Sequence, residues 1–336
     1  MTEKENYLMA LSGKQPEWVP TYSLIPRPGG EKSATMMLEP PILVPHRIGE
    51  SKTDIFGVPY IATYETGNAM LPEPGIFILK DIRQWRDVIK APSIDGIDWE
   101  AMVKKNIEKS GIDRTQTAMS LNLHFGYFQH LMSFMGFSEG LMAMSEEPDE
   151  VMALFDYICS FFMEVADNVI DLYNPDILSL MDDTAAWGAP FISANMYKEM
   201  LVPFHDRWAK KGRDRGLKLT MHNCGKCEGI LDYLVEMGIN AWDPAQTCND
   251  LAAIKQKYGN KLCITGGWDG RGRLLDPDVT DEEIIASVED TFNKNAPGGG
   301  FIWGGGFLGP IDDESVKHKN EVLFGAVNRL AHSFYC

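Results

Sequence analysis

A histidine and two cysteines stand close together in the segment LTMHNCGKCEGI, residues 219–230. His222 and Cys224 end a predicted strand and are separated by one residue, so in extended chain both side chains point the same way. Imidazole and thiolate are good zinc ligands. Cys227 follows at the predicted start of a helix, a position that favours a thiolate. The segment predicts a zinc site at His222 and Cys224, and a buried histidine beside buried free thiols is the alternative.

A further cysteine follows the next predicted strand, in the segment NAWDPAQTCND, residues 240–250. The side chains of Trp242, Gln246 and Cys248 could all reach the same cavity, and we expect Gln246 to be a catalytic residue. Cys248 is the first candidate for a third zinc ligand, and Cys227 comes after it. A loop thiol without a ligand role is the alternative for Cys248.

Two adjacent acids, Asp182 and Asp183, end the predicted strand in DILSLMDDT, residues 176–184. Two adjacent carboxylates at the end of a strand cost free energy unless they bind something, so we expect catalytic roles for both. They could ligate a metal, act as a general base or hold a polar group of the substrate. Capping of a helix by one of the two is the alternative.

Aromatic residues gather at or near several strand exits, which favours a flat or apolar ligand. His124 follows another predicted strand and is expected to be catalytic. Ordinary loop packing is the alternative for any single member of this group. The residues expected to bind substrate are Tyr127, Trp187, Trp242, Trp268 and Trp303.

Glycines end the last two predicted strands, at Gly266, Gly267 and Gly304–Gly306. Because glycine has no side chain, runs of it let a ligand or a partner approach the backbone closely. We therefore expect an open rim at this place.

Strand and helix patterns alternate along the chain with short connections, which implies a parallel sheet with right-handed crossovers. Residues 1–18 hold a predicted helix, and residues 26–53 are interpreted as a long loop. Eight strands in one chain of this size favour a single (β/α)8 TIM-barrel domain, residues 1–336, with an N-terminal helical extension. The predicted strands are Val19–Ile25, Asp54–Tyr64, Thr117–His124, Asp176–Asp182, Leu217–His222, Ile239–Asp243, Leu262–Thr265 and Gly300–Trp303.

The amino-acid composition limits the classes of partner that we expect the protein to bind. The 336 residues carry a net charge of −17, which weighs against nucleic acid and against an anionic membrane surface. No run of about 18 apolar residues occurs, so no span of a bilayer is expected. The first residues lack the features of a signal peptide, so we expect a cytoplasmic protein whose cysteines are thiols or metal ligands. The oligomeric state stays open.

The segment LKLTMHNCGKCEGILDYLVEMGINAWDPAQ resembles the His-x-Cys-Gly region of the uroporphyrinogen decarboxylase superfamily. The resemblance covers nearly the whole chain, from MTEKENYLMALSGKQPEWVP onwards, and implies a (β/α)8 barrel. One activity of that superfamily is decarboxylation of uroporphyrinogen without a cofactor. Its members carry an Arg-Gln-Ala-Gly-Arg signature after the first strand, where this chain reads SLIPRPGGEK with Arg27 alone.

The other activity of the superfamily is zinc-dependent methyl transfer linked to a corrinoid, and its zinc site resembles His222-Asn223-Cys224. The coenzyme M enzymes add a second cysteine near the end of the final strand, where this chain reads WGGG. The resemblance therefore implies Zn²⁺, a corrinoid carried by a partner protein and a small methyl donor or acceptor, with a methoxylated aromatic donor favoured. A uroporphyrinogen decarboxylase and a non-catalytic barrel that binds a corrinoid or tetrapyrrole are the alternatives.

Overall fold

The computed structural model describes residues 1–22, 34–44, 49–123, 126–310 and 312–335. Its main sheet has eight strands, all paired in parallel, in the order β1-β11-β10-β9-β8-β7-β6-β2. Neighbours in space are thus neighbours in the chain, as in a (β/α)8 barrel, and the predicted fold class is confirmed. The strands are β1 Thr21–Tyr22, β2 Thr35–Leu38, β6 Ala118–Leu121, β7 Ile177–Met181, β8 Lys218–His222, β9 Ala241–Ala245, β10 Cys263–Gly267 and β11 Phe301–Gly304.

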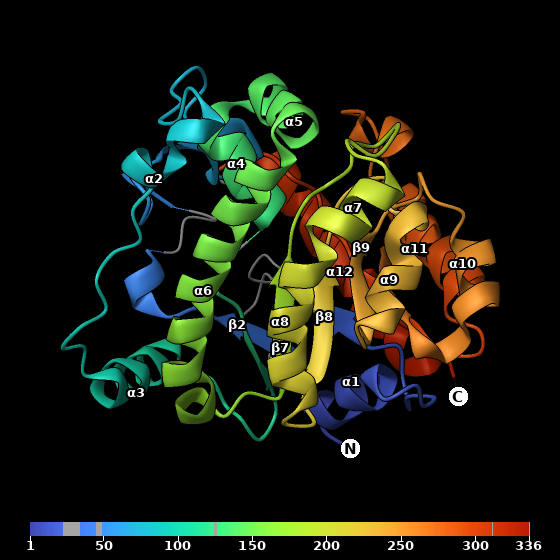
Figure 1. Cartoon of the computed structure of the whole chain (residues 1–336). Coiled ribbons are helices and arrows are strands. Elements are labelled where there is room, and N and C mark those ends of the chain that lie inside the picture. Colours follow the sequence, from blue (N-terminus) through green and yellow to red (C-terminus); the bar gives the residue numbers. More distant parts are fainter. Residues whose placement is uncertain (23–33, 45–48, 124–125, 311, 336) are drawn as a thin grey trace.

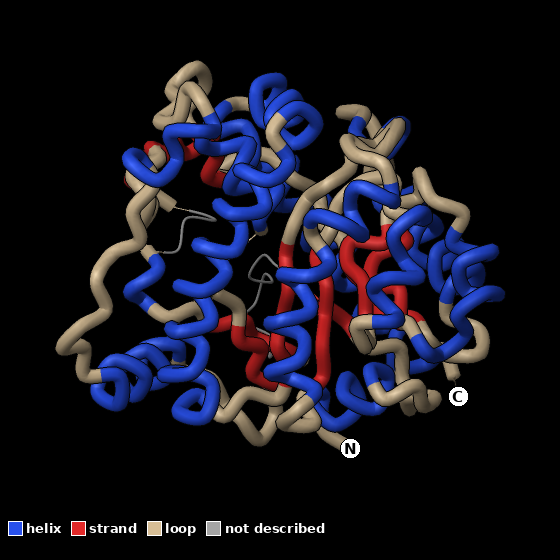
Figure 2. Tube along the Cα trace, viewed as in Figure 1, coloured by secondary structure: helices blue, strands red, loops and turns tan. Residues whose placement is uncertain are grey.

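Helices surround these strands, as Figures 1 and 2 show, and each crossover returns the chain for the next parallel strand. Among the described residues no helix is both long enough and apolar enough to cross a membrane. The helices are α1 Glu3–Leu11, α2 Trp85–Val88, α3 Trp99–Ser110, α4 Tyr127–Met135, α5 Phe137–Glu146, α6 Pro148–Tyr173, α7 Ala194–Met200, α8 Val202–Arg213, α9 Leu231–Glu236, α10 Leu251–Tyr258, α11 Asp281–Asn295 and α12 Glu314–Ser333.

The second barrel strand differs from the prediction. It is β2, which lies inside the region 26–53 that the sequence suggested was loop. The segment around Pro59 instead belongs to a separate antiparallel sheet of β3 (Lys52–Thr53), β4 (Pro59–Thr63) and β5 (Ala69–Pro72). Pro59 is the first residue of β4, where a missing N–H is tolerated. The β2 residues TMML are too few and too uniformly apolar to show a period.

The helix α1 covers the amino ends of the barrel strands (Figure 1), which confirms the predicted N-terminal helix. A Thr2–Glu5 capping box fixes its start. Its buried apolar residues pack against residues at or just before the start of barrel strands in a small inner cluster, made of Tyr7, Ala10, Leu11, Ala34, Ala118, Ile177, Ala241, Cys263 and Ile302. A larger cluster fills the space between strands and helices. Because α1 covers one end, the opposite end, where the βα loops lie, is the place for a site.

Candidate metal centre

Three potential ligands from two neighbouring strands converge at the carboxyl end of the barrel. His222 is the last residue of β8, and Cys224 lies two residues later. Side chains alternate along a strand, and Leu219 and Met221 point into the larger cluster between strands and helices, which we call the outer cluster. His222 and Cys224 therefore point to the opposite, inner side. The Cys224 Sγ lies 3.5 Å from His222 Nε2. Asp183, two residues beyond β7, places its Oδ1 3.8 Å from the same Nε2. The ligand atoms of these three residues all lie within 4.8 Å of one another.

This donor set fits zinc. Nitrogen, sulfur and oxygen ligands all bind Zn²⁺, and three protein ligands with one open position is the pattern of catalytic rather than structural sites. All three side chains are partly buried, so a bound ion would face both the protein and the barrel mouth. The spacing of His222 and Cys224 in the sequence predicted that these two side chains lie together.

Asp243 orients the imidazole of His222. It is the third residue of β9 and pairs with His222 in the β8–β9 ladder. The His222 Nδ1 lies 2.8 Å from Asp243 Oδ2, and a carboxylate only accepts, so Nδ1 carries the proton and donates. In the neutral imidazole that binds a metal, the lone pair of Nε2 then faces Cys224 and Asp183, the arrangement of a carboxylate–histidine–metal site.

Electrostatics at the site depend on burial and on these partners. Burial opposes the charged form of His222, but the charge and hydrogen bond of Asp243, with Cys224 and Asp183, raise its pKa well above the usual value. Burial also raises the pKa of the Cys224 thiol, and the hydrogen bond from His222 offsets part of that effect. A bound divalent cation would favour the thiolate and the neutral imidazole, since ligands bind in their deprotonated forms.

The two adjacent acids have different partners. Asp182 is fully buried, and its two carboxylate oxygens each accept a backbone N–H, from Phe128 and Gln129 at 3.1 Å, at the start of α4. Asp182, which directly follows β7, therefore caps the amino end of α4. Asp183 faces the barrel mouth, and its Oδ1 accepts the Cys224 N–H at 2.7 Å. Side chains alternate along β7 and along the two residues that follow it, so the side chains of Asp182 and Asp183 point to opposite sides.

Asn223, between the two ligands, ties the β7 and β8 loops together. Its side chain is fully buried and forms two hydrogen bonds with Thr184. Its Oδ1 accepts the Thr184 N–H at 3.0 Å, and its Nδ2 donates to Thr184 Oγ1 at 2.9 Å. The Asn223 carbonyl accepts the Trp242 Nε1–H at 2.9 Å. These bonds hold His222 and Cys224 in fixed relation to the Asp183 strand.

The other two cysteines near the site do not join the group of ligand atoms found among the described residues. Cys227 is buried, and its Sγ donates to the backbone carbonyls of Asn223 and Cys224, at 3.3 and 3.2 Å. Cys248 is partly exposed, and its Sγ accepts from Asn249 Nδ2 at 3.4 Å. Asp183 thus takes the place near His222 at which the sequence analysis expected Cys248.

Gln246, predicted to be catalytic, lies beside the site, and its Oε1 accepts the Gly225 N–H at 2.7 Å. Gly225 has φ of +88°, and a Cβ there would meet the Ala185 carbonyl oxygen at 2.5 Å. Gln246 therefore holds a turn that only glycine can form. The predicted catalytic His124 lies outside the described residues.

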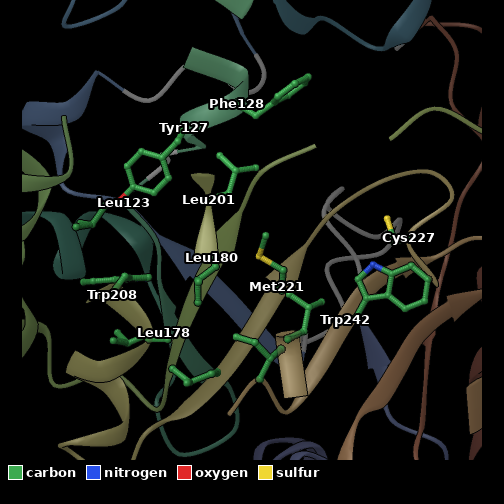
Figure 3. Packing of buried hydrophobic residues seen from close by; sticks show 14 of the residues in the cluster. Leu123, Tyr127, Phe128, Leu178, Leu180, Leu201, Trp208, Met221, Cys227 and Trp242 are labelled. Atoms are coloured by element: carbon green, nitrogen blue, oxygen red, sulfur yellow. The ribbon is translucent and has the colours of Figure 1, made fainter. Parts of the chain in front are cut away.

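The predicted aromatic rim divides into core and surface residues. Tyr127, Trp242 and Trp303 are fully buried among the outer cluster, and Figure 3 shows Tyr127 and Trp242 within it. Only Trp187 and Trp268 retain exposed surface near the mouth. The Trp187 ring is 37% exposed and lies under the Arg271 guanidinium, 3.1 Å from the ring centroid. Among the five residues expected to bind substrate, Trp187 and Trp268 are thus the two that are not fully buried.

The glycines of the last strands serve packing. A Cβ on Gly305 would lie 2.8 Å from Trp268 Cε3, and one on Gly270 would lie 2.5 Å from Trp268 Cη2. The Trp268 ring thus lies between two backbone segments, and its Nε1 donates to Ser287 Oγ at 2.9 Å. Gly305 therefore makes room for the Trp268 ring, a packing role that differs from the expected open rim.

Three residues of the site were absent from the sequence prediction: Gln129, Asn223 and Asp243. Asp243 ends the predicted strand Ile239–Asp243, so the rule that strand exits carry function could have found it. Gln129 and Asn223 act through contacts between separate βα loops, for which the sequence holds no local signal.

Comparisons with known proteins bear on the family and on the fold of the chain. A family model described as Uroporphyrinogen decarboxylase (URO-D) matches residues 125–314, more than half of the chain. A Methylated-thiol–coenzyme M methyltransferase of Methanosarcina mazei is 27% identical over 144 residues, which are 41% of this chain. The match spans 35% of that relative's own length. A solved structure, a methyltransferase from Methanosarcina mazei, superposes over 100% of both chains with a TM-score of 0.61 and 14% identity, a likeness of fold.

Proposed function

The chain belongs to the uroporphyrinogen decarboxylase (URO-D) family, as its sequence implied, and we propose that it is a zinc-dependent methyltransferase. It would move a methyl group between a small substrate and a corrinoid carried by a partner protein. The observation that carries the proposal is the convergence of Asp183, His222 and Cys224 at the barrel mouth. The likeness to a coenzyme M methyltransferase supports the reaction class.

Asp183, His222 and Cys224 would hold the zinc ion. Bound there, zinc would supply Lewis-acid chemistry, holding a substrate thiolate or polarising an ether oxygen so that its methyl group can leave. The carboxylate and the thiolate bring two negative charges and match the charge of the ion. Asp243 keeps the His222 Nε2 lone pair turned to the site by accepting the Nδ1–H at 2.8 Å.

For the substrate we propose a small methoxylated molecule. Asp183 supplies a carboxylate oxygen, and such a donor is harder than the thiolate that Cys248 would have supplied. A harder set favours an oxygen atom of the substrate over a sulfur atom. An aromatic ring in that molecule would pack against the part of Trp187 that is exposed near the mouth.

Zinc content tests the site. We expect about one zinc per chain in the wild type, and most of it should be lost in Asp183→Ala, His222→Ala and Cys224→Ser. Cys248→Ser is the matched control, because it makes the same change at a thiol outside the ligand group. Full zinc in the Cys224→Ser variant, or loss of zinc from Cys248→Ser with retention in Asp183→Ala, would overturn the ligand assignment.

Methyl transfer tests the reaction. The zinc-loaded protein should methylate a reduced corrinoid protein with at least one compound from a panel of methoxyaromatics, methylated thiols and methylated amines. Incubation with uroporphyrinogen should leave it unchanged. Decarboxylated product would support the cofactor-free activity of the family instead. Tight corrinoid binding without turnover of any donor would indicate a binding protein.

A further inference from the structure

A glutamine connects the two acids that the sequence places side by side. Gln129, in the first turn of α4, donates its backbone N–H to Asp182 Oδ1 at 3.1 Å. Its side-chain Nε2 donates to Asp183 Oδ2 at 3.1 Å. Since a carboxylate only accepts, the amide must present its nitrogen to Asp183. Gln129 thus contacts both the buried Asp182, which caps its own helix, and the partly buried Asp183 of the site.

The Asp183 carboxylate is held from both sides. Its Oδ1 accepts the Cys224 N–H at 2.7 Å, and its Oδ2 accepts from Gln129. The Asp183 side chain is 31% exposed, so without the Gln129 bond it has room to rotate towards solvent. The amide therefore opposes a rotation that would take the carboxylate away from His222.

The surrounding backbone fixes Gln129 itself. A Cβ on Gly126 would lie 2.8 Å from Gln129 Oε1 and 2.7 Å from Asp182 Oδ1. Only a residue without a side chain leaves this space, and the two N–H bonds to Asp182 then hold the first turn of α4 in place. The amide is thus preorganised by a buried carboxylate that is not itself a member of the ligand group.

We propose that Gln129 is a positioning residue that fixes the Asp183 carboxylate as a metal ligand and thereby sets the zinc affinity of the site. The inference rests on the proposed zinc site. Hydrogen-bond partners of metal ligands orient those ligands, and their loss costs about 10- to 100-fold in metal affinity. Asp182 supports the site one step further away, by holding the start of α4.

A double-mutant cycle on zinc affinity tests this role. The dissociation constant of zinc is measured by competition with chelators of graded strength, for wild type, Gln129→Met, Asp183→Ala and the double variant. Gln129→Met removes the donor and keeps the length of the side chain and a good helix former. Gln256→Met is the matched control, since it makes the same change on an exposed face of α10.

We expect Gln129→Met to weaken zinc binding about 10- to 100-fold and Gln256→Met to leave it unchanged. In the Asp183→Ala background the Gln129→Met change should cost less than about two-fold, because Gln129 acts through that carboxylate. Melting of the zinc-free proteins checks that Gln129→Met folds as the wild type does. In the cobalt-loaded variant the thiolate charge-transfer band should persist while the d–d bands shift.

The result that overturns the inference is an unchanged affinity in Gln129→Met, or an equal loss with and without Asp183. The second outcome would show that Gln129 acts through the fold of α4. If the wild type binds no zinc, the proposed function fails together with this inference. If the wild type binds zinc and Gln129→Met binds it equally well, only this inference fails.

Discussion

Asn223→Ala should destabilise the zinc-free protein strongly, although residue 223 contributes no ligand atom. The change removes both side-chain bonds to Thr184 and leaves the Thr184 N–H and Oγ1 without these partners. Thr184 is only 3% exposed, so water does not replace them freely. A buried polar group without a partner costs about 1–3 kcal/mol, so two such groups cost about 2–6 kcal/mol. The total stability of a protein is about 5–15 kcal/mol, so the loss is large.

Chemical denaturation in the presence of a chelator measures this loss without any contribution from metal. The slope of the unfolding free energy with denaturant should stay constant, so that the midpoint reports stability. Asn195→Ala, on an exposed face of α7, is the control and should change stability by less than about 0.5 kcal/mol. A loss below about 1 kcal/mol in Asn223→Ala would refute the reasoning, because Thr184 would then have other partners.

Three further changes have definite expected outcomes. Asp243→Asn should weaken zinc binding about 10- to 100-fold, because His222 loses its charged acceptor, and an unchanged dissociation constant would contradict this. Burial, partly offset by backbone hydrogen bonds, raises the pKa of Asp54 to about 6. The stabilising effect of its neutral form is full below pH of about 4 and is lost as the pH rises through about 6. From pH of about 3 to pH of about 7 the unfolding free energy of the wild type should fall by about 3 kcal/mol relative to Asp54→Asn, and parallel pH profiles in denaturant would exclude the effect. Gly305→Leu should lower stability by about 1–3 kcal/mol, because it displaces the Trp268 ring. A melting curve identical to that of the wild type would show that the ring moves freely.

The barrel followed from the sequence because its strands and helices recur with short connections, and seven of the eight predicted strands correspond to barrel strands of the structure. The second strand did not follow, since TMML is short and carries no period. The predicted strand at Asp54–Tyr64 pairs instead within the antiparallel sheet. Local pattern shows that a segment is extended, but only pairing decides which sheet it joins.

The sequence by itself determined that the two candidate ligands on one strand lie together. His222 and Cys224 are two residues apart in extended chain, and the pleat of a strand sends both to the same side whatever surrounds them. The same alternation places Asp183 on the same side of β7 as Met181. The sequence could not say which side of that strand faces the inside of the barrel.

Only the tertiary structure decided the roles that depend on contacts between strands. It gave Asp182 to the start of α4 and Asp183 to the ligand group, and it brought Asp183 rather than Cys248 to His222. It also placed Trp242 and Trp303 in the core. The physical reason is that a ligand set is defined by distances of a few ångströms between atoms on separate βα loops. Those distances depend on the register between strands and on caps such as Asp182, which no single segment encodes.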